Sequence, residues 1–251
     1  MLPQITIFNY QVSSYSLCAI AGIAAVVFFN SFRMEKYKIS FKELILYYVF
    51  GFVFLLIFAK ILYVVGIIPE DGLSFKIIWD NLINGGIVFY GGVIGALFGI
   101  ILCAKILKAD IREKLDFFAP CIPLFHVFAR MGCALSGCCY GIESTFGIHN
   151  YKFPGATLWP FQPVESICNL IIFLALIIYT KVRSSNKYCL EIYLVSYGIC
   201  RFVLEFFRGD PVRGVWADGL STSQHIAIIL VLCVIVEILI LFGKKGGKKN
   251  E

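Results

Sequence analysis

The chain has 251 residues, of which 59% are hydrophobic and 15% are charged, and its formal net charge is +6. Soluble domains contain about 45–50% apolar and about 25% charged residues, so this composition indicates an integral membrane protein. A basic chain can also bind nucleic acid, but the lysines and arginines described below lie where they mark the cytoplasmic face of a membrane. We therefore exclude nucleic acid and expect the lipid bilayer to surround the chain.

Seven apolar segments are long enough to be membrane-spanning helices, each of which needs about 20 mainly apolar residues. They lie at about 13–32, 43–67, 86–107, 117–136, 164–181, 188–207 and 224–242. The first segment has no basic stretch before it and no small-residue cleavage site after it, so we expect it to remain in the membrane. The sequence predicts an all-α integral membrane protein with a single transmembrane domain over residues 1–251.

Lysine and arginine are distributed unequally between the two sides of the predicted membrane. Fifteen of the 22 lie on one side, at Arg33, Lys36, Lys38, Lys42, Lys105, Lys108, Arg112, Lys114, Lys181, Arg183, Lys187, Lys244, Lys245, Lys248 and Lys249. Four lie on the other side, at Lys76, Lys152, Arg208 and Arg213. Because cytoplasmic loops carry the excess of positive charge, we predict the N-terminus outside and the C-terminus in the cytoplasm. The loops at about 68–85, 137–163 and 208–223 then face outward, and their composition is typical of re-entrant or interfacial segments.

The remaining three basic residues, Lys60, Arg130 and Arg201, fall within predicted spans, where charge is costly and often functional. Arg201 and Glu205 are four residues apart on one helix and can pair, either as a structural ion pair or as part of a site. Arg130 has no carboxylate at helical spacing in its own span, and its planar guanidinium suits a phosphate. Lys60 is a weaker candidate because its stem can extend toward the interface.

Glycines are concentrated in the segment NGGIVFYGGVIGALFG, residues 84–99. Such glycines usually let two helices approach closely. Gly91 and Gly92, near the outer end of the span, can also allow backbone amides to reach an anion, and Tyr90 would place its hydroxyl nearby.

Three of the ten cysteines lie in the segment RMGCALSGCCYG, residues 130–141. Cys133, Cys138 and Cys139 do not form the CxxC-type pair of structural zinc sites, so we predict no metal and no cofactor. Three roles stay open for these residues: small packing residues, a disulfide, or a nucleophilic thiolate beside Arg130. His126, one helical turn before Arg130, is either a polar core residue or a catalytic one.

These segments, in this order, resemble the prolipoprotein diacylglyceryl transferase family, whose signature runs Gly-Arg-x-Gly-Asn-Phe-x-Asn-Gly-Glu-x-x-Gly. The segment ARMGCALSGCCYG keeps Arg130, Gly132, Gly137 and Gly141 of that signature. Five further segments resemble family motifs: VSSYSL, FAKILYVV, GGIVFYGGVIG, WPFQPVE and YGICRFVLEFFR with the following GLSTSQ. The resemblance implies a seven-span enzyme of the bacterial cytoplasmic membrane, with its active site toward the outer leaflet. Such an enzyme moves a diacylglyceryl group from phosphatidylglycerol to the lipobox cysteine of a prolipoprotein.

The resemblance and the reasoning from the residues together assign residues to this reaction. The catalytic candidates are Arg130, Arg201, Glu205, Tyr90, Cys138, Cys133 and His126. The substrate-binding candidates are Tyr15, Lys60, Gly91, Gly92, Ser136, Gly137, Gly141, Gln162 and Glu165.

The chain departs from the family pattern where chemistry is expected. Tyr90 stands where the family has histidine, Cys133 and Cys138 stand where it has asparagine and glutamate, and Ser136 replaces a second asparagine. The base for the acceptor thiol is therefore unassigned, with His126 as a possible substitute. Two alternatives stay open: a related transferase with a different acceptor or a covalent lipid intermediate on Cys138, and a non-catalytic lipid-binding or transport protein.

Overall fold

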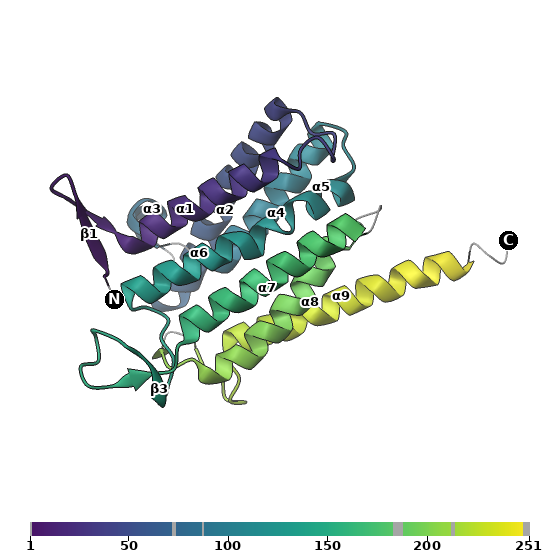
Figure 1. The fold of residues 1–251 in the computed structure, drawn as a ribbon. Helices are drawn as coiled ribbons and strands as arrows, with labels where there is room; N and C mark the ends of the chain where they lie inside the picture. Colours follow the sequence, from purple (N-terminus) through teal and green to yellow (C-terminus); the bar gives the residue numbers. More distant parts are fainter. Residues whose placement is uncertain (1, 72–73, 87, 183–187, 212–213, 248–251) are drawn as a thin grey trace. The chain divides into compact units, whose positions relative to one another are not determined.

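The structure is a computed structural model that describes residues 2–71, 74–86, 88–182, 188–211 and 214–247, and most of these residues are helical (Figure 1). The chain forms two compact units, Met1–Ser31 with Ala119–Glu251 and Phe32–Phe118, and each unit is described by itself. Five of the basic residues used to predict the orientation lie outside the described residues, namely Arg183, Lys187, Arg213, Lys248 and Lys249.

The first unit is a row of helices in which α1 packs against α6, α6 against α7, α7 against α8 and α8 against α9 (Figure 1). Its elements are β1 (Gln4–Ile7), β2 (Tyr10–Ser13), α1 (Ser14–Ser31), α6 (Cys121–Ser136), β3 (Glu143–His149), β4 (Thr157–Leu158), α7 (Phe161–Val182), α8 (Cys189–Leu204), the 3-10 helix η1 (Glu205–Phe207) and α9 (Thr222–Gly247). Leu176 and Cys189 are fully buried between α7 and α8, with Tyr193 beside them. Buried polar residues gather near the end of α6, the start of α7 and the end of α8, among them Glu165 and Arg201.

The second unit comprises α2 (Phe41–Asp71), α3 (Phe75–Asn84), α4 (Phe89–Ile106) and α5 (Ile111–Phe118). Its α2 and α4 lie in close contact along the glycine-rich face of α4. A Cβ atom on Gly95 would lie 2.1 Å from the Phe54 carbonyl oxygen, and one on Gly99 would lie 2.4 Å from that of Phe50. Only glycine permits such an approach, which confirms helix packing as a role of this segment.

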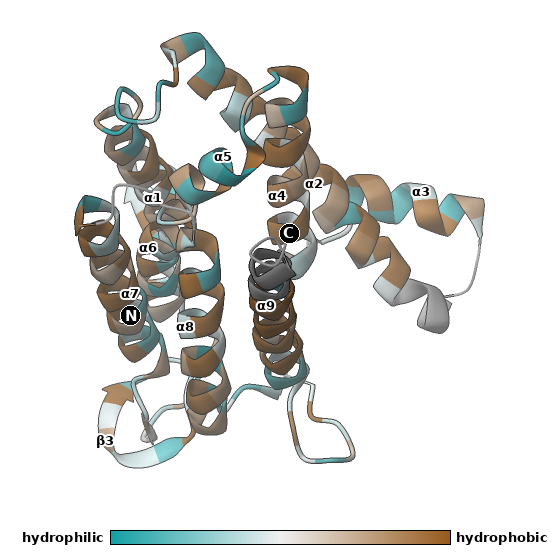
Figure 2. Ribbon diagram, turned by 90° about the vertical axis from the view of Figure 1, so that its right-hand side faces the viewer, coloured by the Kyte–Doolittle hydropathy of each residue, from teal (hydrophilic) through white to brown (hydrophobic). Residues whose placement is uncertain are grey.

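Among the residues that the structure describes, five helices are long and apolar enough to cross a membrane: Ser14–Ser31, Phe41–Gly66, Ile111–Ser136, Phe161–Val182 and Thr222–Ile240. The segment Tyr90–Ile106 is a shorter apolar helix. In Figure 2 the long helices are coloured mostly as hydrophobic, and the hydrophilic colour is concentrated in the segments that join them. This confirms a mostly helical membrane protein.

Two small antiparallel hairpins, β1 with β2 and β3 with β4, depart from the all-α prediction. The first turns at Phe8 and Asn9, which both have positive φ, as a two-residue hairpin loop requires. The second lies within the predicted outer loop at 137–163. Both were missed because their strands are short and lack a long alternation of apolar and polar residues.

The loop predicted at 68–85 contains α3, whose Phe75 and Trp79 side chains stack on each other and are exposed. Aromatic side chains of this kind are enriched where membranes meet water. The helix therefore fits the interfacial segment that the sequence predicts there.

Candidate active site

Glu165, at the start of α7, is fully buried at the centre of a polar cluster in the first unit. One of its carboxylate oxygens lies 2.9 Å from Arg130 Nε of α6 and 3.4 Å from Arg201 Nη1 of α8. The Tyr197 hydroxyl donates a hydrogen bond of 3.1 Å to its other oxygen. Arg130 thus has a carboxylate partner, which comes from another helix and not from its own span.

The charged row continues beyond Glu165. Arg201 Nη2 lies 2.7 Å from a Glu205 carboxylate oxygen, which confirms the pairing predicted across one helical turn. The other Glu205 oxygen lies 3.8 Å from Arg208 Nη1, and Arg208 in turn binds Asp210 through two nitrogens. Arginines and carboxylates therefore alternate along the whole row, which offsets the cost of burying each charge.

Arg208 lies outside the helices, in the segment that follows η1. Its burial disfavours the charged form, but the hydrogen bond and the attraction from Asp210 outweigh this and raise the pKa of Arg208 above its ordinary value. Arg208 therefore stays a cation at any physiological pH.

Arg130 is the most accessible arginine of the row. Its side chain is 16% exposed, against 6% for Arg201, whose two terminal nitrogens already contact Glu165 and Glu205. An incoming anion can therefore reach Arg130 more readily, while Arg201 holds the two carboxylates in place.

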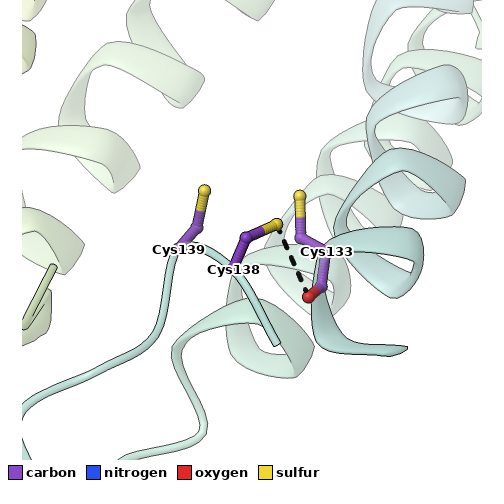
Figure 3. A group of neighbouring side chains, drawn as sticks. All are labelled: Cys133, Cys138 and Cys139. Carbon is purple, nitrogen blue, oxygen red and sulfur yellow. Dashed lines mark hydrogen bonds between the residues drawn. The ribbon is translucent and has the colours of Figure 1, made fainter. Parts of the chain in front are cut away.

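The three cysteines of the signature segment meet just beyond α6. The helix ends at Gly137, whose φ of 65° is left-handed, and the chain turns back so that Cys138 and Cys139 approach Cys133. The sulfur atoms of the three residues all lie within 4.8 Å of one another (Figure 3). All ten cysteines are free thiols in the structure, so no disulfide is formed.

Two buried amides hold the segment that carries these thiols. Asn150 Nδ2 donates to the Gly137 carbonyl oxygen at 3.1 Å, and Gln162 Nε2 donates to that of Cys138 at 2.7 Å. Gly141 also packs closely against the backbone of Trp159, since a Cβ atom on Gly141 would lie 2.3 Å from the Trp159 carbonyl oxygen. Gln162 and Gly141, predicted to bind substrate, thus shape the loop.

The thiols are electrostatically coupled to the arginines. Hydrogen bonds from Cys133 and Cys138 lower the pKa of the Cys139 thiol, and Arg130 and Arg208 favour its thiolate against the cost of burial. Arg208 Nη2 lies 4.0 Å from the Cys139 sulfur. The nearby guanidinium of Arg208 therefore favours the thiolate form of Cys139.

Tyr15 and His126 lie in the same unit, with different exposure. Tyr15 of α1 is 42% exposed and interacts electrostatically with Arg130 and with all three thiols. His126 is 3% exposed, with its ring centroid 5.2 Å from that of Tyr197. This burial favours the polar core role for His126 over that of a base open to substrate.

Ser136 lies at the last position of α6, and its hydroxyl is buried without a hydrogen-bond partner among the described residues. Its backbone carbonyl accepts a hydrogen bond of 3.4 Å from the Tyr151 hydroxyl. The hydrogen-bonding capacity of the Ser136 hydroxyl is thus unused within the described part of the chain.

The second unit holds the other candidates, Lys60, Tyr90, Gly91 and Gly92. Lys60 Nζ donates to the carbonyl oxygens of Gly85, at 2.6 Å, and Ile83, at 3.3 Å, so it neutralises the C-terminal end of α3. Gly91 faces the backbone of α2, where a Cβ atom would lie 2.5 Å from a carbonyl oxygen. Lys60 and Gly91 therefore have structural roles within their own unit.

Four further residues belong to the cluster but were not predicted as site residues: Tyr197, Arg208, Asp210 and Asn150. A signal was present for Arg208, which follows Glu205 by three residues, a spacing at which side chains can pair across a helical turn. Asp210 is also local, since it binds Arg208 two residues before it, whereas Tyr197 and Asn150 contact residues that are distant in the sequence.

A sequence profile described as prolipoprotein diacylglyceryl transferase matches residues 3–240. The chain belongs to the prolipoprotein diacylglyceryl transferase family. A relative from Clostridium perfringens, phosphatidylglycerol–prolipoprotein diacylglyceryl transferase 2, is 31% identical, and the match covers 97% of this chain and 96% of that protein. Relatives of the same activity name from Clostridium tetani and Streptococcus uberis are 28% and 29% identical, over 90% and 96% of this chain and 92% and 95% of theirs. Family membership and the apolar helices together make this chain a membrane transferase of that family.

Proposed function

We propose that this protein transfers the diacylglyceryl group of phosphatidylglycerol to the cysteine thiol of a prolipoprotein, at the outer leaflet of the bacterial cytoplasmic membrane. The family supplies the reaction class, and its relatives carry this activity in their names. The observation that carries the proposal is the row of buried ion pairs that ends at the accessible Arg130, within electrostatic reach of the hydroxyl of Tyr15.

In this reaction the acceptor sulfur attacks the diacylglyceryl carbon that is bonded to the phosphate oxygen. The carbon–sulfur bond forms as the carbon–oxygen bond breaks, the thiol loses its proton, and glycerol phosphate leaves. The leaving group is more anionic than the phosphodiester from which it comes. Arg130 therefore stabilises the transition state more than the bound lipid, which is the requirement for catalysis.

The other cluster residues support Arg130. Glu165 and Arg201 are positioning residues, because both are enclosed by charged partners. Tyr15 binds the headgroup, and the second-unit residues Tyr90 and Gly92 stay proposed substrate contacts from the family pattern.

We also propose the finer topology, in which α1, α2, α4, the Ile111–Ser136 segment, α7, α8 and α9 are seven spans of one transmembrane domain over residues 1–251. The N-terminus lies outside and the C-terminus in the cytoplasm. The excess of lysine and arginine in alternate loops supports this orientation.

The purified full-length protein, given labelled phosphatidylglycerol and a lipobox peptide, tests the reaction. We expect label on the peptide cysteine and none on a peptide with serine in its place. Arg130→Lys keeps the charge but loses the planar fork, and the loss of a charged hydrogen bond worth about 1.5–3 kcal/mol lowers kcat/KM by roughly 10- to 100-fold. Lys152→Arg, an exchange at an exposed loop position, is the matched control.

Bound phosphatidylglycerol without any transfer by the wild-type protein contradicts this function. That outcome identifies a lipid-binding or transport protein on the same scaffold.

A further inference from the structure

The three-thiol cluster of Cys133, Cys138 and Cys139 is the feature of the first unit that the proposed reaction leaves unexplained. Three sulfur atoms within 4.8 Å of one another can converge on one metal ion. In a tetrahedral zinc site with Zn–S bonds of about 2.3 Å, neighbouring sulfurs lie roughly 3.8 Å apart. Side-chain adjustments of about an ångström therefore suffice, without movement of the backbone.

The backbone that carries the cluster is fixed before any ligand binds. Cys139 has a φ of 54°, a left-handed conformation that a residue with a side chain adopts only when its surroundings hold it. The flanking carbonyl groups are held by Asn150, by Gln162 and by the backbone amide of Gly209, which donates to the Tyr140 carbonyl oxygen at 2.9 Å. The sulfur positions are thus preorganised, as a metal site requires.

The cluster is open on one side. Cys133 is buried, whereas Cys138 and Cys139 are half-buried, and no fourth cysteine, histidine or carboxylate joins them within the part of the chain that the structure describes. Structural zinc sites are closed by four protein ligands, and catalytic ones have three with the fourth position open. The donor set therefore corresponds to a catalytic zinc site.

The charges around the three-thiol cluster also favour a zinc ion bound by three thiolates. Zinc with three thiolates has one excess negative charge, and two cations from different segments, Arg130 and Arg208, interact with Cys139. Donors near a metal-bound sulfur stabilise it as a thiolate.

We propose that Cys133, Cys138 and Cys139 bind Zn²⁺ and that its open fourth position binds the acceptor cysteine as a thiolate. The role for the acceptor rests on the proposed function, whereas the metal site does not. On coordination the acceptor S–H bond breaks, its proton passes to water, and the sulfur keeps the electron pair with which it attacks the lipid carbon. Zinc lowers the pKa of its bound thiol and so takes the place of the unassigned base. The sequence reasoning against a metal considered spacing alone and missed that the turn at Gly137 brings the three thiols together.

The metal content of the purified full-length protein tests the site directly. After equilibration with Zn²⁺ and a competing chelator, we expect about one zinc per chain in the wild type, as three thiolate ligands bind tightly. Cys139→Ser removes a loop ligand and raises the zinc dissociation constant by at least about tenfold, whereas Cys233→Ser, an exposed position on α9, leaves it unchanged. Gel filtration and bound phosphatidylglycerol report whether Cys139→Ser has kept its fold.

If the wild-type protein binds no more zinc than the Cys139→Ser variant, the proposed zinc site is wrong. A disulfide among the three thiols in protein isolated without reductant also overturns the site. So does a mass addition from donor lipid on Cys138, because an alkylated sulfur is no longer an anionic zinc ligand.

Cobalt substitution tests the fourth position separately from turnover. Co²⁺ shows a sulfur-to-metal charge-transfer band whose intensity increases with each bound thiolate. We expect a lipobox peptide to increase this band and the serine peptide to leave it unchanged, and an unchanged band with both overturns the acceptor role. If the cobalt-loaded protein binds the cysteine peptide but the zinc-loaded protein transfers no lipid, the metal site is supported and the proposed diacylglyceryl transfer is wrong.

Discussion

At the scale of single residues, Glu165 is the member of the polar cluster on which the others depend. It contacts Arg130 of α6 and both Arg201 and Tyr197 of α8, and it has no exposed surface of its own. The negative charge of Glu165 offsets the cost of burying the positive charges of Arg130 and Arg201 in an apolar environment. Its loss leaves uncompensated charge rather than merely one missing contact.

We expect Glu165→Gln to destabilise the protein by about 3–5 kcal/mol, because a neutral amide leaves Arg130 and Arg201 buried beside reduced negative charge. Denaturant unfolding in detergent micelles measures the change. Glu143→Gln, at an exposed position of β3, makes the same exchange without a buried partner and stays within about 0.5 kcal/mol of the wild type. Equal effects of the two substitutions would show that the Glu165 ion pairs contribute nothing.

At the scale of single elements, the turn after α6 decides where the signature residues lie. Gly137 combines a left-handed conformation with close contact, since a Cβ atom there would lie 2.7 Å from Tyr151 Cε1. The helix can end at this position and the chain reverse only because the residue has no side chain. The positions of Cys138 and Cys139 follow from this turn.

Gly137→Ala therefore destabilises the folded protein in two ways. An alanine in the left-handed conformation costs roughly 1–2 kcal/mol, and its methyl group clashes with Tyr151. We expect a lower free energy of unfolding and a displaced loop, with transfer activity reduced. Gly155→Ala is the matched variant, since Gly155 also has positive φ but has no atom near its Cβ position. If both variants lose the same stability, only the backbone conformation matters and the contact with Tyr151 has no effect.

The contact between α2 and α4 in the second unit depends on Gly95, which matters for lack of space and not for its backbone conformation. Gly95 is helical, but a Cβ atom there would lie 2.1 Å from the Phe54 carbonyl oxygen. We expect Gly95→Ala to cost about 1–3 kcal/mol, since the helices must separate to accept the methyl group. Gly51→Ala on α2 has open space around its Cβ position and is neutral or stabilising, by up to about 1 kcal/mol. Thermal unfolding of the two variants checks this difference, and an equally stable Gly95→Ala protein would contradict the close approach of the helices.

At the scale of the whole molecule, the sequence predicts what depends on local spacing and on segment length. The helices α1 and α7 follow from apolar length, and the pair of Arg201 with Glu205 follows from the pitch of one helix. Contacts that arise between segments were not predictable. Arg130 and Glu165 are on different helices, and the thiols converge because the chain reverses at Gly137. Neither arrangement leaves a periodic signal in the sequence.

The orientation of the chain in the membrane is a property of all its loops together, so it is tested by reporters on both sides. Alkaline phosphatase is active only outside the cytoplasm, and green fluorescent protein becomes fluorescent in the cytoplasm. We expect phosphatase activity for a fusion at Lys152, between β3 and β4, and none at Lys108, between α4 and α5. A fluorescent protein after Glu251 then fluoresces.

The physical reason for this pattern is the excess of lysine and arginine on the Lys108 side, which resists translocation. The converse result, an active phosphatase at Lys108 and an inactive one at Lys152, would place Arg130 and the thiols near the cytoplasmic leaflet. A secreted prolipoprotein could then meet the site only before its export, so the reporter pair also tests which leaflet supplies the lipid. Two active fusions would instead require an even number of spans between Lys108 and Lys152, in conflict with the single crossing assigned to the Ile111–Ser136 segment.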